Sequence, residues 1–315
     1  MEITRAEAFA PATMANLGVG FDVLGLAFAA PGDLVRAERS ERPGVTISAI
    51  IGDDGKLPLD LEQNTAGVAA RSVLRLLNVE ETFGVRLTIH KGLPRASGLG
   101  SSAASAVAAA VAVNALLGEP LTRAELLPAC LDGEAVASGY HPDNIAPCLF
   151  GGITLAYGIE AHQIISLPIP ERLILATVTP AIEVPTKEAR AALPTHVPMR
   201  AVVAQTAQIA RLIDALHRGD VPEMAAAMEA DRIIEPARFH LMPHLAEVRS
   251  AAKAAGAHGV VISGAGPTLC AVCDQDEAAA RAAEAMAQVY HMRGIDAIGR
   301  CVSISAEGAR VRMLA

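Results

Sequence analysis

The sequence predicts an α+β fold in which helices cover one face of a sheet. Alternating apolar runs that are typical of strands are interleaved with longer apolar runs of helical spacing. Of the 315 residues, 52% are apolar, which is ample for sizeable cores. Because strands and helices are mixed along the chain, we expect a sheet with helices on one side.

The first half of the chain contains most of the predicted strands. The predicted elements are strands over 3–9, 23–28, 34–39 and 45–50, a helix over 65–77 that Asn64 could cap, a strand over 85–90, helices over 101–117 and 123–138, a turn-rich segment over 139–147, and strands over 152–157 and 163–167. Pro168 and Pro170 then indicate a linker. We therefore predict two domains, residues 1–168 and residues 169–315.

The second half is richer in helices. The predicted elements are a strand over 172–178, helices over 186–193, 199–217, 220–233 and 243–255, two strands, a helix over 276–290 and a final strand. This order again indicates an α+β domain.

Composition argues against two classes of partner. The formal net charge is -8 without a basic cluster, and only 3% of the residues are aromatic, so nucleic acid is not an expected partner. Residues 1–5 show no signal pattern, and the apolar run at 103–117 is too short to span a bilayer. We expect a cytoplasmic protein without a membrane partner.

Cysteine and histidine spacings offer two weak metal signals. Cys270 and Cys273 form a CxxC, but they fall in a predicted strand, where positions three apart face opposite sides. His240 and His244 have the spacing of a helical pair, but Pro243 interrupts the helix. We expect neither pair to bind a metal.

The most informative stretch is residues 94–104, PRASGLGSSAA, between a predicted strand and a predicted helix. Gly98 and Gly100 permit positive φ and close approach of a ligand, and Ser101 and Ser102 place hydroxyls and free amides where the helix begins. Unpaired N–H groups and the helix dipole both favour an anion there, so we predict a phosphate site.

Three interpretations of this loop compete. It lacks the Gly-Lys-Ser/Thr ending of a P-loop. Residues 98–103 fit the loose dinucleotide pattern GxGxxA, yet residues 90–97 separate them from the strand, and no acidic strand end follows the helix. An ordinary Ser-capped helix after a glycine turn would explain two glycines alone.

The full eleven residues resemble the phosphate-binding motif of the GHMP kinases, the family of galactokinase, homoserine kinase, mevalonate kinase and phosphomevalonate kinase. Residues 10–22 resemble the first motif of that family, and residues 263–268 resemble its third. The resemblance implies a two-domain GHMP kinase fold, with an N-terminal ribosomal-protein-S5-like domain, a C-terminal ferredoxin-like domain and an active site between them. It also implies a homodimer.

Three other stretches resemble the signature of the family members that act on homoserine: residues 138–147, 186–190 and 235–238. The resemblance implies L-homoserine and ATP as substrates, with Mg²⁺ as cofactor. The implied homoserine-binding residues are Asn16, Asp22, His141, Asn144, Arg190 and Arg238. Their chemistry suits an amino acid, because a guanidinium binds a carboxylate through two hydrogen bonds and a carboxylate binds an ammonium.

The resemblance also implies the nucleotide and catalytic residues. The implied nucleotide-binding residues are Pro94, Arg95, Ala96, Ser97, Gly98, Leu99, Gly100, Ser101, Ser102, Ala103 and Ala104, together with Asn64 and Lys91. Ser102 and Glu134 would hold Mg²⁺, and Asn144 would lie near the hydroxyl that is phosphorylated. Ser102, Glu134 and Asn144 are thus the implied catalytic residues.

The general base is the least defined part of this interpretation. An amide such as Asn144 cannot accept a proton at neutral pH, and Asp143 is its acidic neighbour. We expect catalysis by positioning and charge stabilisation instead. Two other functions stay open, namely a kinase for another small alcohol and a non-catalytic nucleotide-binding regulator. The presence of Ser102 and Glu134 argues against the regulator.

Overall fold

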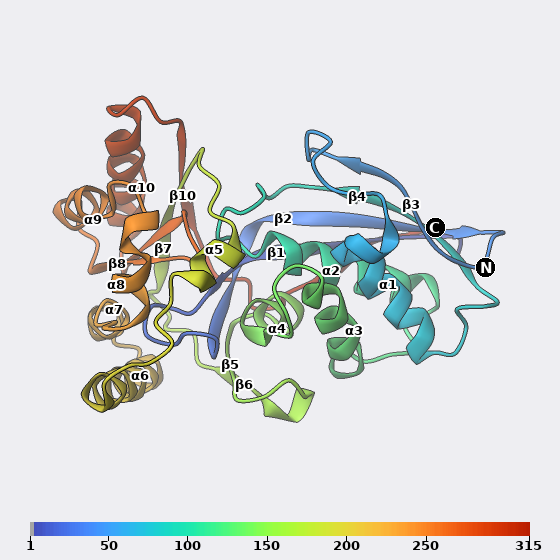
Figure 1. Cartoon of the computed structure of the whole chain (residues 1–315), viewed down its shortest axis with the longest axis horizontal. Coiled ribbons are helices and arrows are strands. Elements are labelled where there is room, and N and C mark those ends of the chain that lie inside the picture. Colours follow the sequence, from blue (N-terminus) through green and yellow to red (C-terminus); the bar gives the residue numbers. More distant parts are fainter. Residues whose placement is uncertain (1–2) are drawn as a thin grey trace.

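The computed structural model describes residues 3–315 and consists of two sheets with their helices, side by side along the long axis (Figure 1). Met1 and Glu2, which begin the stretch without a signal pattern, lie outside the described residues. The α+β, two-domain fold that the sequence predicts is confirmed.

The first sheet carries the N-terminal half. Its strands are β1 (Arg5–Ala15), β2 (Leu24–Ser40), β3 (Gly44–Ile51), β4 (Gly84–His90), β5 (Ile153–Ala156), β6 (Ile164–Leu167) and β11 (Arg310–Leu314). They lie in the order β11-β1-β2-β4-β3, and β5 pairs with β2 and β6. The last strand of the chain therefore completes the first sheet, antiparallel to β1.

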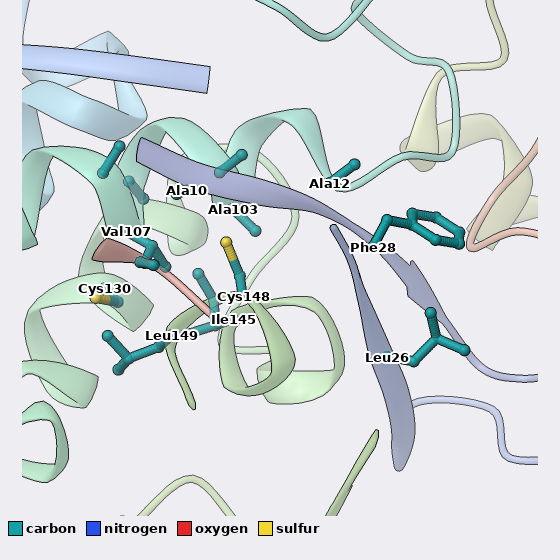
Figure 2. Close-up of a cluster of buried hydrophobic side chains, with 14 of the residues drawn as sticks. Ala10, Ala12, Leu26, Phe28, Ala103, Val107, Cys130, Ile145, Cys148 and Leu149 are labelled. Atoms are coloured by element: carbon teal, nitrogen blue, oxygen red, sulfur yellow. The ribbon is translucent and has the colours of Figure 1, made fainter. Parts of the chain in front are cut away.

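Helices pack on one face of this sheet. They are α1 (Thr65–Leu76), α2 (Ser101–Leu116), α3 (Arg123–Ala135) and α4 (Pro142–Phe150), with a 3-10 turn at Leu61–Gln63 and another at Ala161–Gln163. The alanine-rich α2 is buried almost throughout and lies against β1 and β2. Figure 2 shows Val107 of α2 gathered with Cys148 and Leu149 of α4 below β1. Small side chains let α2 approach the sheet closely, which brings its first turn near the end of β1.

The second sheet has the order β10-β7-β9-β8. Its strands are β7 (Ile174–Pro180), β8 (Gly259–Ile262), β9 (Leu269–Cys273) and β10 (Ala297–Val302), and its helices are α5 (Thr186–Ala191), α6 (Met199–Arg218), α7 (Val221–Met228), α8 (Ile234–Arg238), α9 (Leu245–Ala254) and α10 (Asp276–His291), with a 3-10 turn at Phe239–Leu241. If the four strands are numbered along the chain, their order across the sheet is 4-1-3-2, and helices connect the first strand to the second and the third to the fourth. That is the ferredoxin-like arrangement.

Several predicted elements were wrong in detail. Residues 139–147 were expected to form a turn-rich segment, but α4 begins at Pro142, because proline is compatible with the first helical turn. The runs 23–28 and 34–39 form one strand, because pairing with β1 continues through Gly32 and Asp33. The helix expected over 220–233 ends at Met228, and α8 is a separate short helix.

The chain passes from the first sheet to the second near the predicted linker. β6 ends at Leu167 and β7 begins at Ile174. The division at residue 168 stays a prediction, and β11 returns to the first sheet after it. Within residues 3–315, no helix is both long and apolar enough to cross a bilayer.

The five cysteines are free, and four of them are buried. Cys270 and Cys273 both lie on β9, and they pack into two different hydrophobic clusters. The prediction that they face opposite sides of a strand is confirmed.

Candidate active site

The glycine loop joins β4 to α2, and its conformation depends on glycine. Gly98 and Gly100 have φ values of 78° and 64°, as the sequence predicts. A Cβ on Gly98 would lie 2.3 Å from the carbonyl oxygen of Ser263. Gly100 stands at the N-cap of α2 and offers no side chain to bond the first amides of the helix. The helix therefore begins with N–H groups available to an anion.

The second glycine loop, residues 263–268, packs directly on the first. Ser263 Oγ donates to Gly98 O at 2.7 Å, and Thr268 N donates to Ser97 O at 3.1 Å. The two domains are thus hydrogen-bonded to each other at the glycine loop.

A cavity of about 440 Å³ opens between the domains at this point. The predicted residues that line it are Asn16, Asp22, Asn64, Lys91, Arg95, Ala96, Ser97, Gly98, Gly100, Ser101, Ser102, Glu134, His141, Asn144, Arg190 and Arg238. Four predicted loop residues do not line it. Pro94 borders a neighbouring cavity, and Leu99, Ala103 and Ala104 are buried in the core. The last three residues support the loop by packing.

Lys91 lies beneath the loop in a buried network. Its Nζ pairs with Asp33 of β2, and it donates to Ser101 O at 3.0 Å and to Ser105 Oγ at 2.7 Å. Asp33 Oδ1 accepts from the amides of Gly92 and Leu93 at 2.9 and 3.2 Å. The Lys91 ammonium therefore holds the start of α2, and its three donors are already engaged within the protein.

Asn64 caps α1, as the sequence predicts. Its Oδ1 accepts from Ala66 N and Gly67 N at 3.0 and 3.2 Å, and its Nδ2 donates to Pro58 O at 2.9 Å. The side chain fixes the wall of the cavity that α1 provides.

Glu134 is buried, lines the cavity and lies near the end of α3. Its Oε1 accepts from Ser102 Oγ at 3.0 Å and from Ser138 Oγ at 2.5 Å. Its Oε2 is buried without a hydrogen-bond partner in residues 3–315. Burial raises the pKa of this carboxyl to about 7.

These atoms fit a magnesium ion that is shared with a polyphosphate. Mg²⁺ prefers oxygen ligands, and it needs few from the protein when phosphates supply others. A buried carboxylate oxygen without a partner, beside a serine hydroxyl, is such a ligand set. No group of three or more His, Cys, Asp or Glu side chains that could hold a metal ion by themselves occurs among the described residues.

Asp22 and Arg190 form an ion pair in the cavity wall, joined by two hydrogen bonds. Arg190 Nη1 donates to Asp22 Oδ2 at 3.0 Å, and Nη2 donates to Oδ1 at 2.9 Å. His141 Nδ1 lies 3.8 Å from Asp22 Oδ2. Burial and the positive charge of Arg190 lower the pKa of His141. The predicted binders of opposite ends of a zwitterion thus face each other.

Arg238 is buried beside this pair. It donates to Ala189 O at 3.1 Å and to Gly264 O at 3.0 Å. Its guanidinium carbon lies 5.2 Å from the ring centre of Phe21, and that of Arg190 lies 5.6 Å from the same ring. Phe21 therefore holds both guanidinium groups by cation–π contacts.

Asn16 ties the first motif to the second glycine loop. Its Nδ2 donates to Gly264 O at 2.9 Å, and its Oδ1 accepts from Asp22 N at 3.1 Å. Asn16 and Asp22 both have positive φ, of 75° and 60°. Because aspartate and asparagine tolerate this conformation, the turn that presents Asp22 can form.

Asn144 and Asp143 lie in the first turn of α4. Asn144 Oδ1 accepts from Thr13 Oγ1 at 2.7 Å. Asp143 is 5% exposed, and burial together with the charges of Asp22 and Glu134 raises its pKa to about 7. A carboxyl that can exchange a proton near neutral pH is thus adjacent to Asn144.

Among the residues that sequence reasoning missed, Thr13, Phe21 and Asp33 contact predicted residues of this site. Thr13 and Phe21 lie within the first motif but were given no role. Asp33 had a readable signal, because it is in phase with Val35 and Ala37 on the buried side of β2. An acidic residue in the buried phase of a strand needs a partner, and that partner is Lys91.

Comparison with known proteins agrees with this geometry. Residues 64–152 match the family described as GHMP kinases N terminal domain, and residues 212–291 match GHMP kinases C terminal. A homoserine kinase of Arabidopsis thaliana is 43% identical over 95% of this chain and 83% of its own. A homoserine kinase of Chlorobium phaeovibrioides is 40% identical over 90% of this chain and 91% of its own. The crystal structure of homoserine kinase from Cytophaga hutchinsonii superimposes with a TM-score of 0.93 at 39% identity, covering 98% of this chain and 97% of that one.

Proposed function

The chain belongs to the GHMP kinase family, and from this membership we propose that it transfers the γ-phosphoryl group of ATP to the side-chain hydroxyl of L-homoserine. The products are ADP and O-phospho-L-homoserine, an intermediate of threonine biosynthesis. The observation that carries the proposal is that one cavity holds both an anion-binding helix start and a paired Asp22 and Arg190. The first suits a polyphosphate and the second an amino acid.

The nucleotide is bound by backbone more than by side chains in this proposal. The amides at the start of α2 and the residues of the loop face the phosphates, and Lys91 holds that start from below. Magnesium, when bound at Ser102 and Glu134, neutralises part of the phosphate charge.

The amino acid binds at the other end of the cavity. Asp22 takes the α-ammonium, and Arg190 with Arg238 takes the α-carboxylate. His141 and Asn16 complete the wall. These assignments give the substrate one orientation, with its hydroxyl towards Asn144 and the glycine loop.

The chemical step is an in-line displacement. The hydroxyl oxygen of homoserine forms the new bond to phosphorus while the bond to the bridging oxygen of ADP breaks, and the hydroxyl proton leaves to a phosphate oxygen or to water. Asn144 positions the hydroxyl and takes no proton. Positioning and charge neutralisation are the contributions of the protein.

The proposal has two further parts. The enzyme acts in the cytoplasm, as the sequence predicts, and it forms a homodimer, as the resemblance to the family implies. Light scattering of the purified protein at micromolar concentration tests the second, since a monomer mass would refute it.

The reaction is tested by ADP release from ATP and Mg²⁺ with L-homoserine, mevalonate, galactose or no acceptor, followed by mass spectrometry of the product. Turnover confined to L-homoserine is expected. Turnover with another alcohol would identify a different kinase. A folded protein that binds ATP and is silent with every acceptor would be a nucleotide-binding regulator.

A further inference from the structure

We propose that Thr13 is a positioning residue that sets the orientation of the Asn144 amide towards the acceptor hydroxyl. The inference rests on the proposed function, because it concerns how Asn144 presents itself to that hydroxyl. It assigns a role to a residue of β1 that neither the loop motifs nor the charge pattern identify.

The contact is specific and protected from solvent. Thr13 is 0% exposed on β1, and its Oγ1 donates to Asn144 Oδ1 at 2.7 Å. An amide has one acceptor atom and one donor group at its end. With Oδ1 engaged by the buried hydroxyl, Nδ2 is the group that Asn144 offers to a ligand in the cavity that it lines.

The glycine loop leaves room for this hydrogen bond. A Cβ on Gly100 would lie 2.0 Å from Thr13 Oγ1 and 2.9 Å from Asn144 Oδ1. Thr13 N also donates to Leu99 O at 3.0 Å. Thr13 therefore contacts the loop that binds the phosphates and, through its side chain, the amide that binds the acceptor.

This arrangement has a chemical consequence for the acceptor. When Nδ2 donates to the hydroxyl oxygen, one lone pair of that oxygen is held and another stays free to attack phosphorus. The hydroxyl proton then points away from Asn144, towards the phosphate or water. An amide turned by 180° would instead accept a hydrogen bond from the hydroxyl and leave the attacking lone pair unoriented.

Two substitutions at position 13 separate this role from packing. Thr13→Val keeps the shape and removes the hydroxyl, whereas Thr13→Ser keeps the hydroxyl and removes a methyl group. We expect Thr13→Val to lower kcat by roughly 10- to 100-fold with little change in the KM for ATP, because one buried hydrogen bond is lost. Thr13→Ser should stay within about 3-fold of the unmodified enzyme.

A double-mutant cycle tests whether Thr13 acts through Asn144. In an Asn144→Ala background, Thr13→Val should lower kcat by less than about 2-fold. The same full loss in both backgrounds would overturn the proposal, and so would wild-type kcat in Thr13→Val. Unfolding midpoints and ATP affinity of each variant control for folding.

A readout without turnover keeps this inference separate from the proposed function. The readout is the NMR chemical shift of the Asn144 side-chain NH₂ group in ¹⁵N-labelled protein, which the Asn144→Ala variant assigns. This chemical shift should change in Thr13→Val and stay the same in Thr13→Ser. Absence of L-homoserine phosphorylation in the assay would refute the proposed function. The amide chemical shift would still decide whether Thr13 orients Asn144. An unmoved signal in Thr13→Val would overturn the inference.

Discussion

Asp22 and Arg190 bind each other through two hydrogen bonds, of 3.0 and 2.9 Å, one to each carboxylate oxygen. Asp22 follows β1 in the first domain, and Arg190 belongs to α5 in the second. In Figure 1, α5 lies where the two halves meet. The pair therefore joins the domains at the place where the amino acid is expected to bind, so a zwitterion must replace this contact with its own two charges.

Asp22→Asn is expected to raise the KM for L-homoserine by roughly 10- to 100-fold, because the amide no longer attracts the α-ammonium as a charge. Steady-state kinetics measure the effect, and the KM for ATP should change little. Asp214→Asn, which removes a carboxylate from an exposed pair with Arg218, is the matched control. An unchanged KM for homoserine in Asp22→Asn would contradict the assignment.

Glu134→Gln keeps the size of the side chain but removes its charge. We expect kcat with Mg²⁺ to fall by roughly 100-fold or more, because a ligand to the ion is weakened. ATP binding in EDTA, measured by calorimetry, should be preserved. Glu284→Gln on the exposed face of α10 serves as the control. Equal loss of ATP binding with and without Mg²⁺ would instead indicate a damaged cavity.

Two buried carboxyls with raised pKa values, Glu134 and Asp143, make stability depend on pH. Burial raises the pKa of Glu134 from 4.5 to about 7, so between these values the folded state holds a proton that the unfolded state has lost. The free energy of unfolding of the ligand-free protein should therefore fall as pH rises from 4.5 to about 7. Urea titrations at several pH values measure this slope. Glu134→Gln should make the slope less steep, leaving the contribution of Asp143, and a free energy of unfolding that rises with pH in this window would contradict the burial effect.

Asp143 tests the role of a base. Its pKa, raised to about 7 by burial and by Asp22 and Glu134, would permit proton transfer near neutral pH. If catalysis works by positioning, Asp143→Asn should lose only a few-fold in kcat. A loss of roughly a thousand-fold or more, with KM unchanged, would identify Asp143 as a general base.

The buried ion pair of Lys91 and Asp33 is expected to contribute to the stability of the fold. The two side chains are 4% and 0% exposed, so Asp33→Asn leaves a buried ammonium without its counter-charge. We expect the free energy of unfolding to fall by about 3 to 5 kcal/mol. Chemical denaturation measures it, and Glu38→Gln in a solvent-exposed network is the comparison. Recovery in the double variant Asp33→Asn, Lys91→Met would show that the unpaired charge is the cause.

The sequence allowed the phosphate loop and the overall fold class to be predicted, because glycine and helix-start signals are local. Gly98 and Gly100 have the predicted conformation, and Asn64 caps α1. The helix α4 was missed because Pro142 and Pro147 read as turn signals. Proline in the first turn of a helix breaks no helical hydrogen bond, because the amides there have no partner within the helix. Pro147 has no N–H to bond the carbonyl oxygen of Asp143, and this oxygen packs closely against Gly25 of β2 instead.

The roles of contacts between distant segments could not be predicted. Thr13 and Asn144 are 131 residues apart, and Lys91 and Asp33 are 58 apart. Local propensity carries no information on such pairs, and a threonine in a strand is ordinary. The charge pairing of Asp22 with Arg190 was likewise invisible, because each was assigned to a different end of the ligand.

Strand β1 pairs with β11, which is synthesised much later than β1. The backbone of Thr4 and Arg5 bonds to Ala315, and β11 pairs with β1 along its outer edge (Figure 1). During synthesis β1 leaves the ribosome before the second domain, and this edge stays open while that domain is being translated. The strand that carries Thr13 thus receives its final neighbour only when the last strand emerges, so a nascent chain stalled before residue 310 would expose an unpaired edge to chaperones and to other chains.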